Sequence, residues 1–310
     1  MATDERSQHQ RCTRLWMLAA LAVVALLWPS VVSWQALHHQ AALRQSLANL
    51  QGFSRAQLVD CASFVQAHPL VLLILGQSNA ANHGPDVTDP ATPKMRMVHG
   101  GECAWVGEPL AVGTGNGANL WVRLPSALRE AGSQRPVVLV LLAVDASTVA
   151  DWTAPSGPLR SALQHQLAGL PSSGLQPDFV LWQQGESDVR LGTPPSRYAR
   201  QLQELADHLG QAGIRAPILL ARSTLCRSAP AVAIRQAIMD LIRADERFVA
   251  GPDTDALDAA WARHDGCHFS IAGMNAAAKL WAQALALALA QPPSARKPLP
   301  LAGPARSAPV

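Results

Sequence analysis

The chain has 310 residues, 49% of them hydrophobic, and a formal net charge of +3. This length and composition support one well-buried main domain with appended segments. The basic residues form no stripe interleaved with aromatic side chains, which argues against nucleic-acid binding and favours a small neutral or weakly charged substrate.

The N-terminal part of the chain carries an uncharged apolar run over Leu15–Trp34. This run is long enough to cross a bilayer, whereas the core of a signal peptide spans only about 7–15 residues. Arginines precede it and none follows until Arg44, so the positive-inside rule keeps the N-terminus cytoplasmic and exports the remainder. We predict that residues 1–34 form a cytoplasmic tip and a transmembrane anchor. The alternative is a signal peptide cleaved near Val31–Ser33, followed by secretion.

Composition divides the rest of the chain into three segments. Residues 35–57 are rich in Ala, Leu and Gln at helical spacing and are predicted to form a helical stem. Residues 58–290 form the main domain. Residues 291–310 are rich in Pro and Ala with little apolar content, so we predict a disordered tail.

Short apolar runs alternate with longer segments of helical period in the main domain, a pattern typical of βαβ units and a parallel sheet. The predicted strands are Leu70–Leu75, Met95–His99, Val137–Val144, Phe179–Gln183 and Pro217–Ala221. The predicted helices are Leu120–Ala131, Leu159–Ala168, Ser196–Gly210, Val232–Ala244 and Ala272–Ala290. About five parallel strands covered on both faces give a flavodoxin-like, doubly wound α/β domain. Right-handed crossovers then place the carboxyl ends of the strands along one rim.

Four cysteines lie beyond the apolar run, at positions 61, 103, 226 and 267. An even number in an oxidising compartment indicates two disulfides, for which three pairings are possible. Metal binding by these cysteines is the alternative, but no Cys-x-x-Cys spacing supports it.

The first of three polar clusters is Gly76–Asn79, directly after the first predicted strand of the sheet. Glycine accepts the backbone that a sharp strand-to-helix turn needs. Ser78 then lies near a helix N-terminus, where free N–H groups stabilise a developing negative charge. The alternative is that Ser78 and Asn79 only cap that helix.

The second cluster follows the predicted strand that ends at Gln183. It offers an amide donor at Gln184, a turn at Gly185 and carboxylates at Glu186 and Asp188. Ordinary loop and capping residues are the alternative interpretation of this cluster.

The third cluster precedes the C-terminal helix and contains Asp265 and His268, three residues apart. One turn of chain brings such a carboxylate beside the imidazole and fixes its tautomer. His268 is then placed to accept a proton from a nucleophile. His264, next to Asp265, is predicted to be a surface residue.

A hydroxyl, a base, an orienting acid and amide donors together are the groups needed for acyl transfer through a covalent serine intermediate. The chain has no G-x-S-x-G elbow, which argues against the ordinary α/β-hydrolase fold. The stretches GQSN, QGESD and DGCH resemble the signature blocks of the SGNH/GDSL hydrolase superfamily, in its sialate O-acetylesterase-like and plant-type carbohydrate acetylesterase branch. The resemblance spans about Leu70–Ala290.

This resemblance implies roles for individual residues. Ser78 matches the nucleophile, His268 the general base and then acid, and Asp265 the residue that orients it. The backbone N–H of Ser78, the side chain of Gln184 and the N–H of Gly115 in GTGNG are the implied oxyanion donors.

Further residues are candidates for contact with the substrate or the base. Gln77, Asn79, Asp145 and Trp152 are predicted to bind substrate, the tryptophan by stacking on a sugar ring. Asp145 departs from the Gly-Gly-Thr or Gly-Gly-Ser turn of related domains, which makes the pocket more polar. Glu186 is an alternative acid partner for the catalytic histidine.

The resemblance also implies the disulfides Cys61–Cys103 and Cys226–Cys267, with no metal or organic cofactor. The expected activity is that of an extracytoplasmic serine esterase that removes acetyl groups from carbohydrates, with an acetylated saccharide or another small ester as substrate. The membrane is the expected partner of the N-terminal helix. The alternatives are a glycan O-acetyltransferase and a non-catalytic carbohydrate-binding or assembly module.

Overall fold

The computed structural model describes residues 37–87 and 93–290. It divides the chain into two compact units, Met1–Gln45 and Ser46–Val310, and the sheet and site belong to the second. Residues 37–48 are helical, but the helical stem predicted over residues 35–57 does not continue beyond them, because residues 50–54 have no helical structure and Arg55–Gln57 form only a 3-10 turn. The predicted anchor and the predicted tail lie outside the described residues. No helix within the described part combines the length and the apolar character needed to cross a membrane.

The main domain is built on one mixed sheet, with strand order β1-β4-β3-β5-β2-β6-β7-β8 among the described residues. The strands from β3 to β8 in this order run parallel, and β4 and β1 extend the β3 edge antiparallel. Their bounds are β1 Leu58–Val59, β2 Leu70–Gly76, β3 Met95–His99, β4 Glu102–Val106, β5 Val137–Ala143, β6 Phe179–Gln183, β7 Ile218–Arg222 and β8 Phe248–Asp253.

The fold class is as predicted, but the sheet has eight strands where about five parallel ones were expected. The β8 segment contains Gly251 and Pro252 and therefore lacks a continuous apolar run. β1 has only two residues. The β3–β4 hairpin was missed although its signal is present, because Gly100 and Gly101 both have positive φ angles, as two-residue hairpin turns require.

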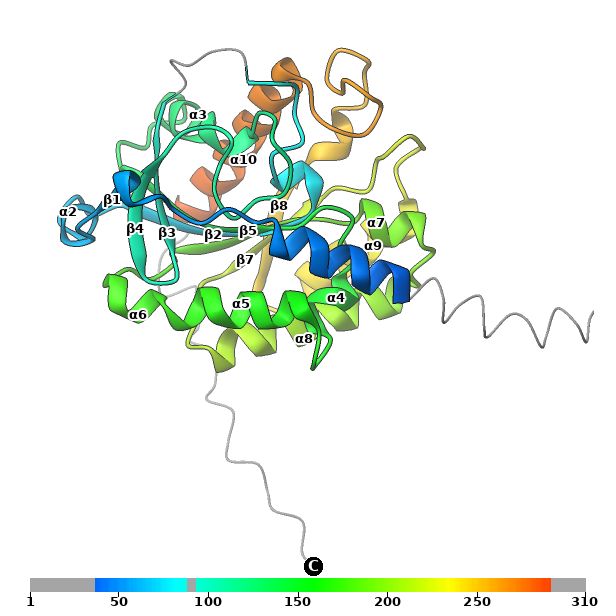
Figure 1. Ribbon diagram of the computed structural model, residues 1–310. Coiled ribbons are helices and arrows are strands. Elements are labelled where there is room, and N and C mark those ends of the chain that lie inside the picture. Colours follow the sequence, from blue (N-terminus) through cyan, green and yellow to red (C-terminus); the bar gives the residue numbers. More distant parts are fainter. Residues whose placement is uncertain (1–36, 88–92, 291–310) are drawn as a thin grey trace, which may run out of the picture. The chain divides into compact units, whose positions relative to one another are not determined.

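Helices cover both faces of the sheet, with α3 and α10 on one side and α5, α6 and α8 on the other (Figure 1). The segment predicted as one helix over Leu120–Ala131 instead splits at Arg123 into a 3-10 turn, η3, and α3. The α-helices are α2 Ala62–Val65, α3 Leu124–Glu130, α4 Val149–Thr153, α5 Pro158–Ala168, α6 Leu170–Ser173, α7 Glu186–Arg190, α8 Pro195–Gln211, α9 Val232–Ala244 and α10 Ile271–Ala290. The 3-10 turns are η1 Arg55–Gln57, η2 Ser78–Ala80, η3 Leu120–Val122 and η4 Thr254–Ala256.

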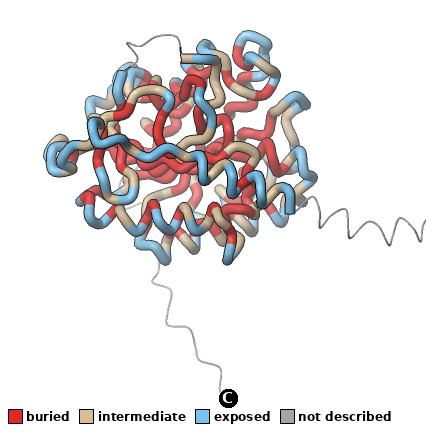
Figure 2. Tube along the Cα trace, in the orientation of Figure 1, coloured by how far each residue is buried: buried red, intermediate tan, exposed pale blue. Residues whose placement is uncertain are grey.

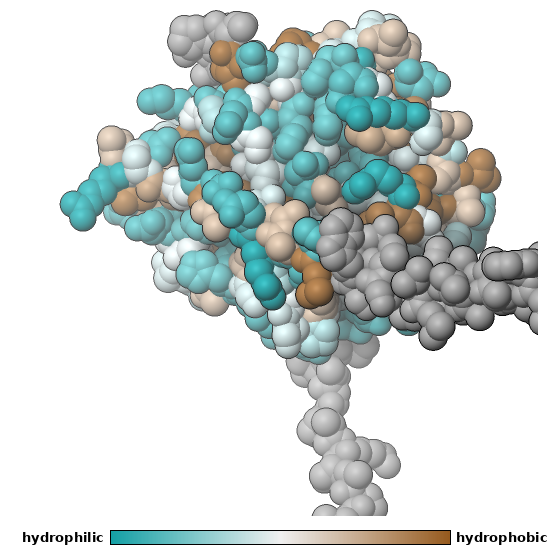
Figure 3. Space-filling view, turned by 45° about the vertical axis from the view of Figure 1, so that its right-hand side comes forward, coloured by the Kyte–Doolittle hydropathy of each residue, from teal (hydrophilic) through white to brown (hydrophobic). Residues whose placement is uncertain are grey.

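The core follows the sheet through the middle of the domain (Figure 2). All residues of β2, β5 and β6 are buried, as expected for parallel strands covered on both faces. Hydrophilic side chains predominate on the face shown in Figure 3, with hydrophobic ones scattered among them. The large buried apolar side chains of the domain come mainly from the sheet and from the helices that cover it.

The register of the central strands brings three polar loops to one edge. Gly76 at the end of β2 pairs with Ala143 of β5 and with Gln183 of β6. An isolated β-bridge pairs Gly113 with Ala143 and places the GTGNG loop beside the end of β5. The turns that follow β2, β5 and β6 therefore leave the sheet side by side.

Gly76 is required by the close approach of β2 and β6. A Cβ at this position would lie 2.2 Å from the carbonyl oxygen of Gln183. We expect Gly76→Ala to lower the free energy of unfolding by about 1–3 kcal/mol, because the strand ends must separate. Urea denaturation measures this change.

Gly210 near the end of α8 provides the control, because a Cβ there would meet nothing within 4 Å. Gly210→Ala is expected to raise the free energy of unfolding by about 0.5–1 kcal/mol, since alanine restricts the unfolded chain. Equal effects of the two substitutions would contradict the packing argument.

Candidate active site

Ser78 begins η2, the single 3-10 turn that follows β2, and only 2% of its surface is exposed. The N-cap residue of this turn is Gln77, and no side chain caps it. The alternative interpretation of Ser78 and Asn79 as helix caps is therefore wrong. Ser78 lies at the edge of the sheet where the turns after β2, β5 and β6 leave it side by side.

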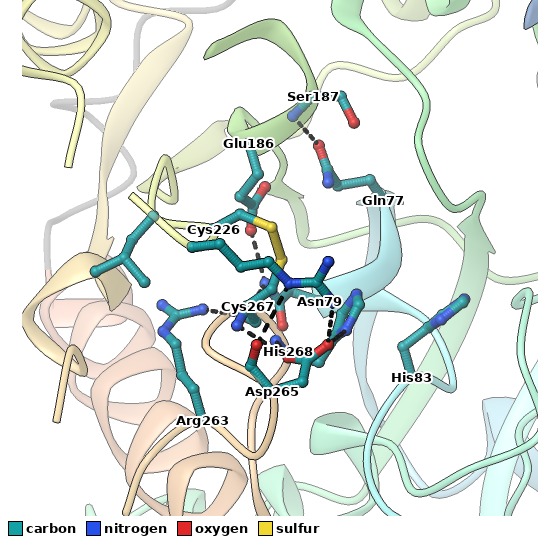
Figure 4. Close-up of a disulfide and its surroundings, with 12 residues drawn as sticks. Gln77, Asn79, His83, Glu186, Ser187, Cys226, Arg263, Asp265, Cys267 and His268 are labelled. Carbon is teal, nitrogen blue, oxygen red and sulfur yellow. Dashed lines mark hydrogen bonds and ion pairs between the residues drawn. A yellow bond between two sulfur atoms is a disulfide. The ribbon is translucent and has the colours of Figure 1, made fainter. Parts of the chain in front are cut away.

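The side chain of Asn79 joins the serine turn to the histidine loop (Figure 4). Its Nδ2 donates to Glu186 Oε1 at 2.7 Å and to the carbonyl of Cys267 at 3.2 Å, and its Oδ1 accepts from the N–H of Phe269 at 3.3 Å. These two loop residues flank His268. The prediction that Asn79 binds substrate is wrong, because both ends of its amide are committed to protein groups.

His268 and Asp265 form the pair that their spacing predicts. The imidazole Nδ1 lies 2.9 Å from Asp265 Oδ2. Asp265 Oδ1 accepts the N–H groups of Cys267 at 2.9 Å and His268 at 2.7 Å, and Arg227 forms an ion pair with Oδ2 at 3.1 Å. A carboxylate on Nδ1 fixes the tautomer, so that Nε2 carries the free lone pair.

The electrostatics of Asp265 follow from these contacts. Partial burial by itself raises the pKa of this carboxyl, but the N–H groups of His268 and Cys267 and the imidazole together hold the pKa well below its usual range. Asp265 is therefore ionised at neutral pH and can stabilise an imidazolium beside it.

The histidine loop is fixed by a disulfide and by a buried arginine. The Cys226–Cys267 disulfide joins the residue before His268 to the chain that follows β7. Arg263 donates to the carbonyl oxygens of Leu257, Thr254 and Cys267. No role was predicted for Arg263, although it lies only two residues before Asp265 in the sequence.

The second disulfide joins Cys61 to Cys103, at the other end of the sheet, on β4. Both pairings are those that the family resemblance implies. The sequence alone had left three pairings open.

His83 was also missed by the sequence analysis, although it lies in the same stretch as Ser78. Its ring stacks on that of His268, with centroids 5.3 Å apart and planes inclined by 27°. Its Nε2 lies 3.2 Å from Thr114 Oγ1, which accepts the N–H of Asp145 at 2.8 Å. Burial is the main reason that the pKa of His83 is lowered, and the charge of Asp145 opposes this shift.

A cavity of about 330 Å³ is lined by His83. Gly115 lines it with φ +84°, and a Cβ there would lie 2.3 Å from the carbonyl oxygen of Asn82, so the position requires glycine. The proposed role of the Gly115 N–H as an oxyanion donor stays a prediction. The lining residues are Ser46, Asn49, Gln51, Gly52, Gln57, Asn82, His83, Val106, Pro109, Leu110, Ala111, Gly113, Thr114, Gly115, Asn116 and Asp145.

A larger cavity of about 620 Å³ lies beside α3 and α10. None of its lining residues belongs to the three polar clusters or contacts the His268–Asp265 pair. The smaller cavity is lined by His83, whose ring stacks on that of His268. We assign the chemistry to the smaller cavity because of this contact.

Gln184 is not available as an oxyanion donor. Its side chain is fully buried, and Nε2 donates both hydrogens, to the carbonyl of Ser147 at 3.0 Å and to Asp188 Oδ2 at 2.6 Å. Its Oε1 accepts from the Tyr198 hydroxyl at 3.1 Å. The prediction is wrong because the amide is turned into the packed interior, where it holds neighbouring loops together.

Glu186 is likewise not the acid partner of His268. Its Oε1 accepts from Asn79 and, at 2.8 Å, from the hydroxyl of Ser223. Its Oε2 has no hydrogen-bond partner among the described residues. Burial raises the pKa of Glu186 to about 7, against the opposing effect of the Asn79 hydrogen bond. Glu186 therefore contacts the histidine loop through Asn79.

Two further substrate-contact predictions concern Trp152 and Gln77. Trp152 is fully buried, donates its ring N–H to the hydroxyl of Ser147 at 3.2 Å and packs edge-to-face on Trp182. It cannot stack on a sugar, so that prediction is wrong. Gln77 is 3% exposed, and its Oε1 accepts the N–H of Ser187 at 3.1 Å. Asp145 is half-buried in the cavity wall, and its contact with substrate stays a prediction.

Comparison with known proteins fits this geometry. The profile of a family described as carbohydrate esterase, sialic acid-specific acetylesterase, matches residues 69–286. The chain belongs to this family. It is accordingly a carboxylic ester hydrolase of the SGNH superfamily, in the sialate O-acetylesterase-like branch. A search of curated protein sequences finds no match.

Solved structures are similar in fold. A protein from Arabidopsis thaliana has a TM-score of 0.58 at 19% identity, covering 71% of this chain and 98% of that one. An acetylxylan esterase from Geobacillus stearothermophilus has a TM-score of 0.44 at 17% identity, covering 69% of this chain and 93% of that one. The first supports the assignment of the fold.

The two disulfides allow a matched test of how the histidine loop is held. They close loops of 42 and 41 residues, so loss of either is expected to destabilise the protein by a similar amount, about 4 kcal/mol in the chain-entropy model. The double substitution Cys226→Ser/Cys267→Ser is expected to lower kcat/KM by about 10- to 100-fold, because it releases His268.

The control is Cys61→Ser/Cys103→Ser, which is expected to leave kcat/KM nearly unchanged at a temperature where both variants are folded. Esterase assays are run beside thermal unfolding curves. Equal losses of activity in the two variants would show that the disulfide beside His268 has no special role.

The buried Glu186 makes stability depend on pH in a defined direction. Its pKa is about 7 in the folded protein and about 4.3 in an unfolded chain. The folded state therefore holds this proton more tightly, and the stability it provides is lost as the pH rises through the folded pKa. Relative to Glu186→Gln, the free energy of unfolding of the parent is expected to fall between about pH 4.3 and about pH 7.

Glutamine at this position keeps an oxygen acceptor for Asn79 and Ser223, which makes the comparison conservative. Urea unfolding of both proteins across this pH range measures the difference. A difference that stays constant, or that changes in the opposite direction, would contradict the burial of an uncharged carboxyl.

Proposed function

We propose that the chain is an extracytoplasmic serine esterase that removes acetyl groups from saccharides through an acyl-enzyme formed on Ser78. The observation that carries this proposal is the His268–Asp265 pair, held beside the serine turn by the amide of Asn79. The two disulfides support a location in an oxidising compartment. Attachment to the membrane through residues 1–34 remains part of the proposal.

The proposed reaction has two halves. In the first, Nε2 of His268 takes the proton of the Ser78 hydroxyl while Oγ attacks the acetyl carbonyl, and Asp265 stabilises the imidazolium. The N–H groups of Ser78 and Gly115 hold the oxyanion. The imidazolium then protonates the departing sugar oxygen, which leaves as a free hydroxyl. In the second half, a water loses a proton to His268 and attacks the acetyl-serine carbonyl. The imidazolium returns that proton to Ser78 Oγ as the acyl–oxygen bond breaks and acetate leaves.

The cavity beside the site supports a neutral saccharide as the leaving group. Several side-chain amides line it, and Asp145 is the one side chain of formal charge among its lining residues. Amides match sugar hydroxyls, which both donate and accept hydrogen bonds. A carboxylate without a neighbouring cation repels an anionic sugar. We therefore propose that neutral acetylated saccharides are better substrates than acetylated sialic acids.

The mechanism is tested with the full-length protein, an aryl acetate and measurement of released acetate. Ser78→Ala is expected to lower kcat by about 10⁴-fold or more. Asp265→Asn is expected to cost about 10⁴-fold, because the imidazole loses its fixed tautomer. Unfolding curves confirm that each variant is folded. A folded Ser78→Ala variant that keeps the parent rate would remove the serine mechanism.

The same assay distinguishes the alternatives. Release of acetate without an acceptor sugar supports a hydrolase over an acetyltransferase, and turnover of any acetate ester argues against a purely binding module. Rates on acetylated xylo-oligosaccharides and on acetylated sialic acid are then compared. A preference for the sialic acid ester would overturn the assignment of a neutral substrate while leaving the esterase mechanism intact.

A further inference from the structure

Three side chains that can bind a metal ion meet at the mouth of the site. His83 follows η2, Asp145 follows β5, and His268 precedes α10. Each offers a donor atom within 4.8 Å of the other two, and all three are half-buried. We propose that His83, Asp145 and His268 form a binding site for Zn²⁺, which inhibits the enzyme reversibly by occupying its catalytic histidine.

His268 is oriented as metal-binding histidines are. Its Nδ1 is held by Asp265 at 2.9 Å, which leaves the lone pair of Nε2 for a ligand. A carboxylate on the far nitrogen of a histidine fixes its ring and makes the other nitrogen a stronger metal ligand. The pairing that prepares His268 to accept a proton therefore also prepares it to bind a metal ion.

Asp145 contributes the negative charge of the proposed site. Its backbone N–H is bound to Thr114 Oγ1, but its carboxylate has no ion pair with a described residue. The carboxylate forms part of the cavity wall together with His83, so a hydrated ion can reach it through the cavity.

Two imidazoles and one carboxylate with an open fourth position are a ligand set that Zn²⁺ favours, whereas Mg²⁺ and Ca²⁺ prefer oxygen ligands. Tetrahedral Zn²⁺ with bonds of about 2.1 Å separates its ligand atoms by about 3.4 Å. The three donor atoms, at most 4.8 Å apart, therefore need to approach by only about 1.4 Å.

A second trio, His264, Asp265 and His268, also has its donor atoms within 4.8 Å. Asp265 is already committed to two backbone N–H groups, to the imidazole and to Arg227. Binding of a metal ion by this trio would break the contacts that form the catalytic pair. The trio that contains Asp145 keeps them, and we therefore assign the ion to it.

Inhibition rests on the proposed function, because Zn²⁺ on Nε2 of His268 takes the lone pair that accepts the serine proton. The ion also fills the space beside His83 and Asp145 where the saccharide is expected to bind. Zn²⁺ is therefore expected to compete with substrate and to be removed by a chelator.

Binding is measured first, by calorimetry with Zn²⁺ and by the visible absorption of bound Co²⁺, on full-length Ser78→Ala. One ion per chain is expected. Adding His83→Ala or Asp145→Asn is expected to weaken binding by at least about tenfold, by analogy with the loss of metal-supporting groups. His165→Ala, at an exposed histidine outside the site, is the matched control and is expected to leave the affinity unchanged.

The alternative trio is tested with His264→Ala. Weaker binding in this variant but not in Asp145→Asn would overturn the proposal, as would the absence of specific binding to Ser78→Ala. In the active protein, Zn²⁺ but not Mg²⁺ at the same concentration is expected to raise the apparent KM, and chelation is expected to restore it. If esterase activity is absent, the binding measurements still decide whether the site exists.

Discussion

The amide of Asn79 is the contact on which the arrangement of the site depends. It is buried, and it joins the turn after β2 to the loop before α10, two segments separated by almost two hundred residues. Both its donor and its acceptor are used, and Glu186 fixes which way the amide faces. A buried polar network of this kind specifies one arrangement, because any other leaves a polar group without a partner. The serine turn and the histidine loop are thus placed by hydrogen bonds between loops.

The histidine loop needs several constraints because it has no regular secondary structure to hold it. Strands β2, β5 and β6 fix one another through their ladder, whereas the chain from Arg263 to Phe269 lies outside the sheet. The disulfide at Cys267, the guanidinium of Arg263 and the carboxylate of Asp265 replace the ladder. Each binds a different point of the loop, and together they hold His268 in one position although the loop lies outside the sheet.

Charge is distributed unevenly around the site, with consequences for both substrate and metal ion. Asp265 is ionised and compensated by several donors, and Glu186 is buried where burial favours its uncharged form. Asp145 faces the cavity without a cation beside it. An uncompensated carboxylate next to two imidazoles favours a neutral sugar or a divalent cation over an anionic ligand. Asp145, with His83 and His268 near it, therefore underlies both the proposed preference for neutral saccharides and the proposed inhibition by Zn²⁺.

The sequence by itself determined the elements with strong local signals. β3, β6 and α9 have the predicted bounds, since apolar runs and helical periodicity depend only on neighbouring residues. The His268–Asp265 contact was also predictable, because residues three apart in a tight turn meet whatever surrounds them. β8 escaped prediction because its pairing with β7, rather than its own composition, makes it a strand.

Only the tertiary structure decided which polar side chains of the motifs face the site. Gln184 and Asn79 follow strand ends as predicted, and Trp152 lies on α4. All three side chains turn inward and bind buried partners. His83 joins the site although nothing in its spacing relates it to His268. The direction of a side chain is set by packing between elements that are distant in sequence, and a pattern of neighbouring residues does not contain that information.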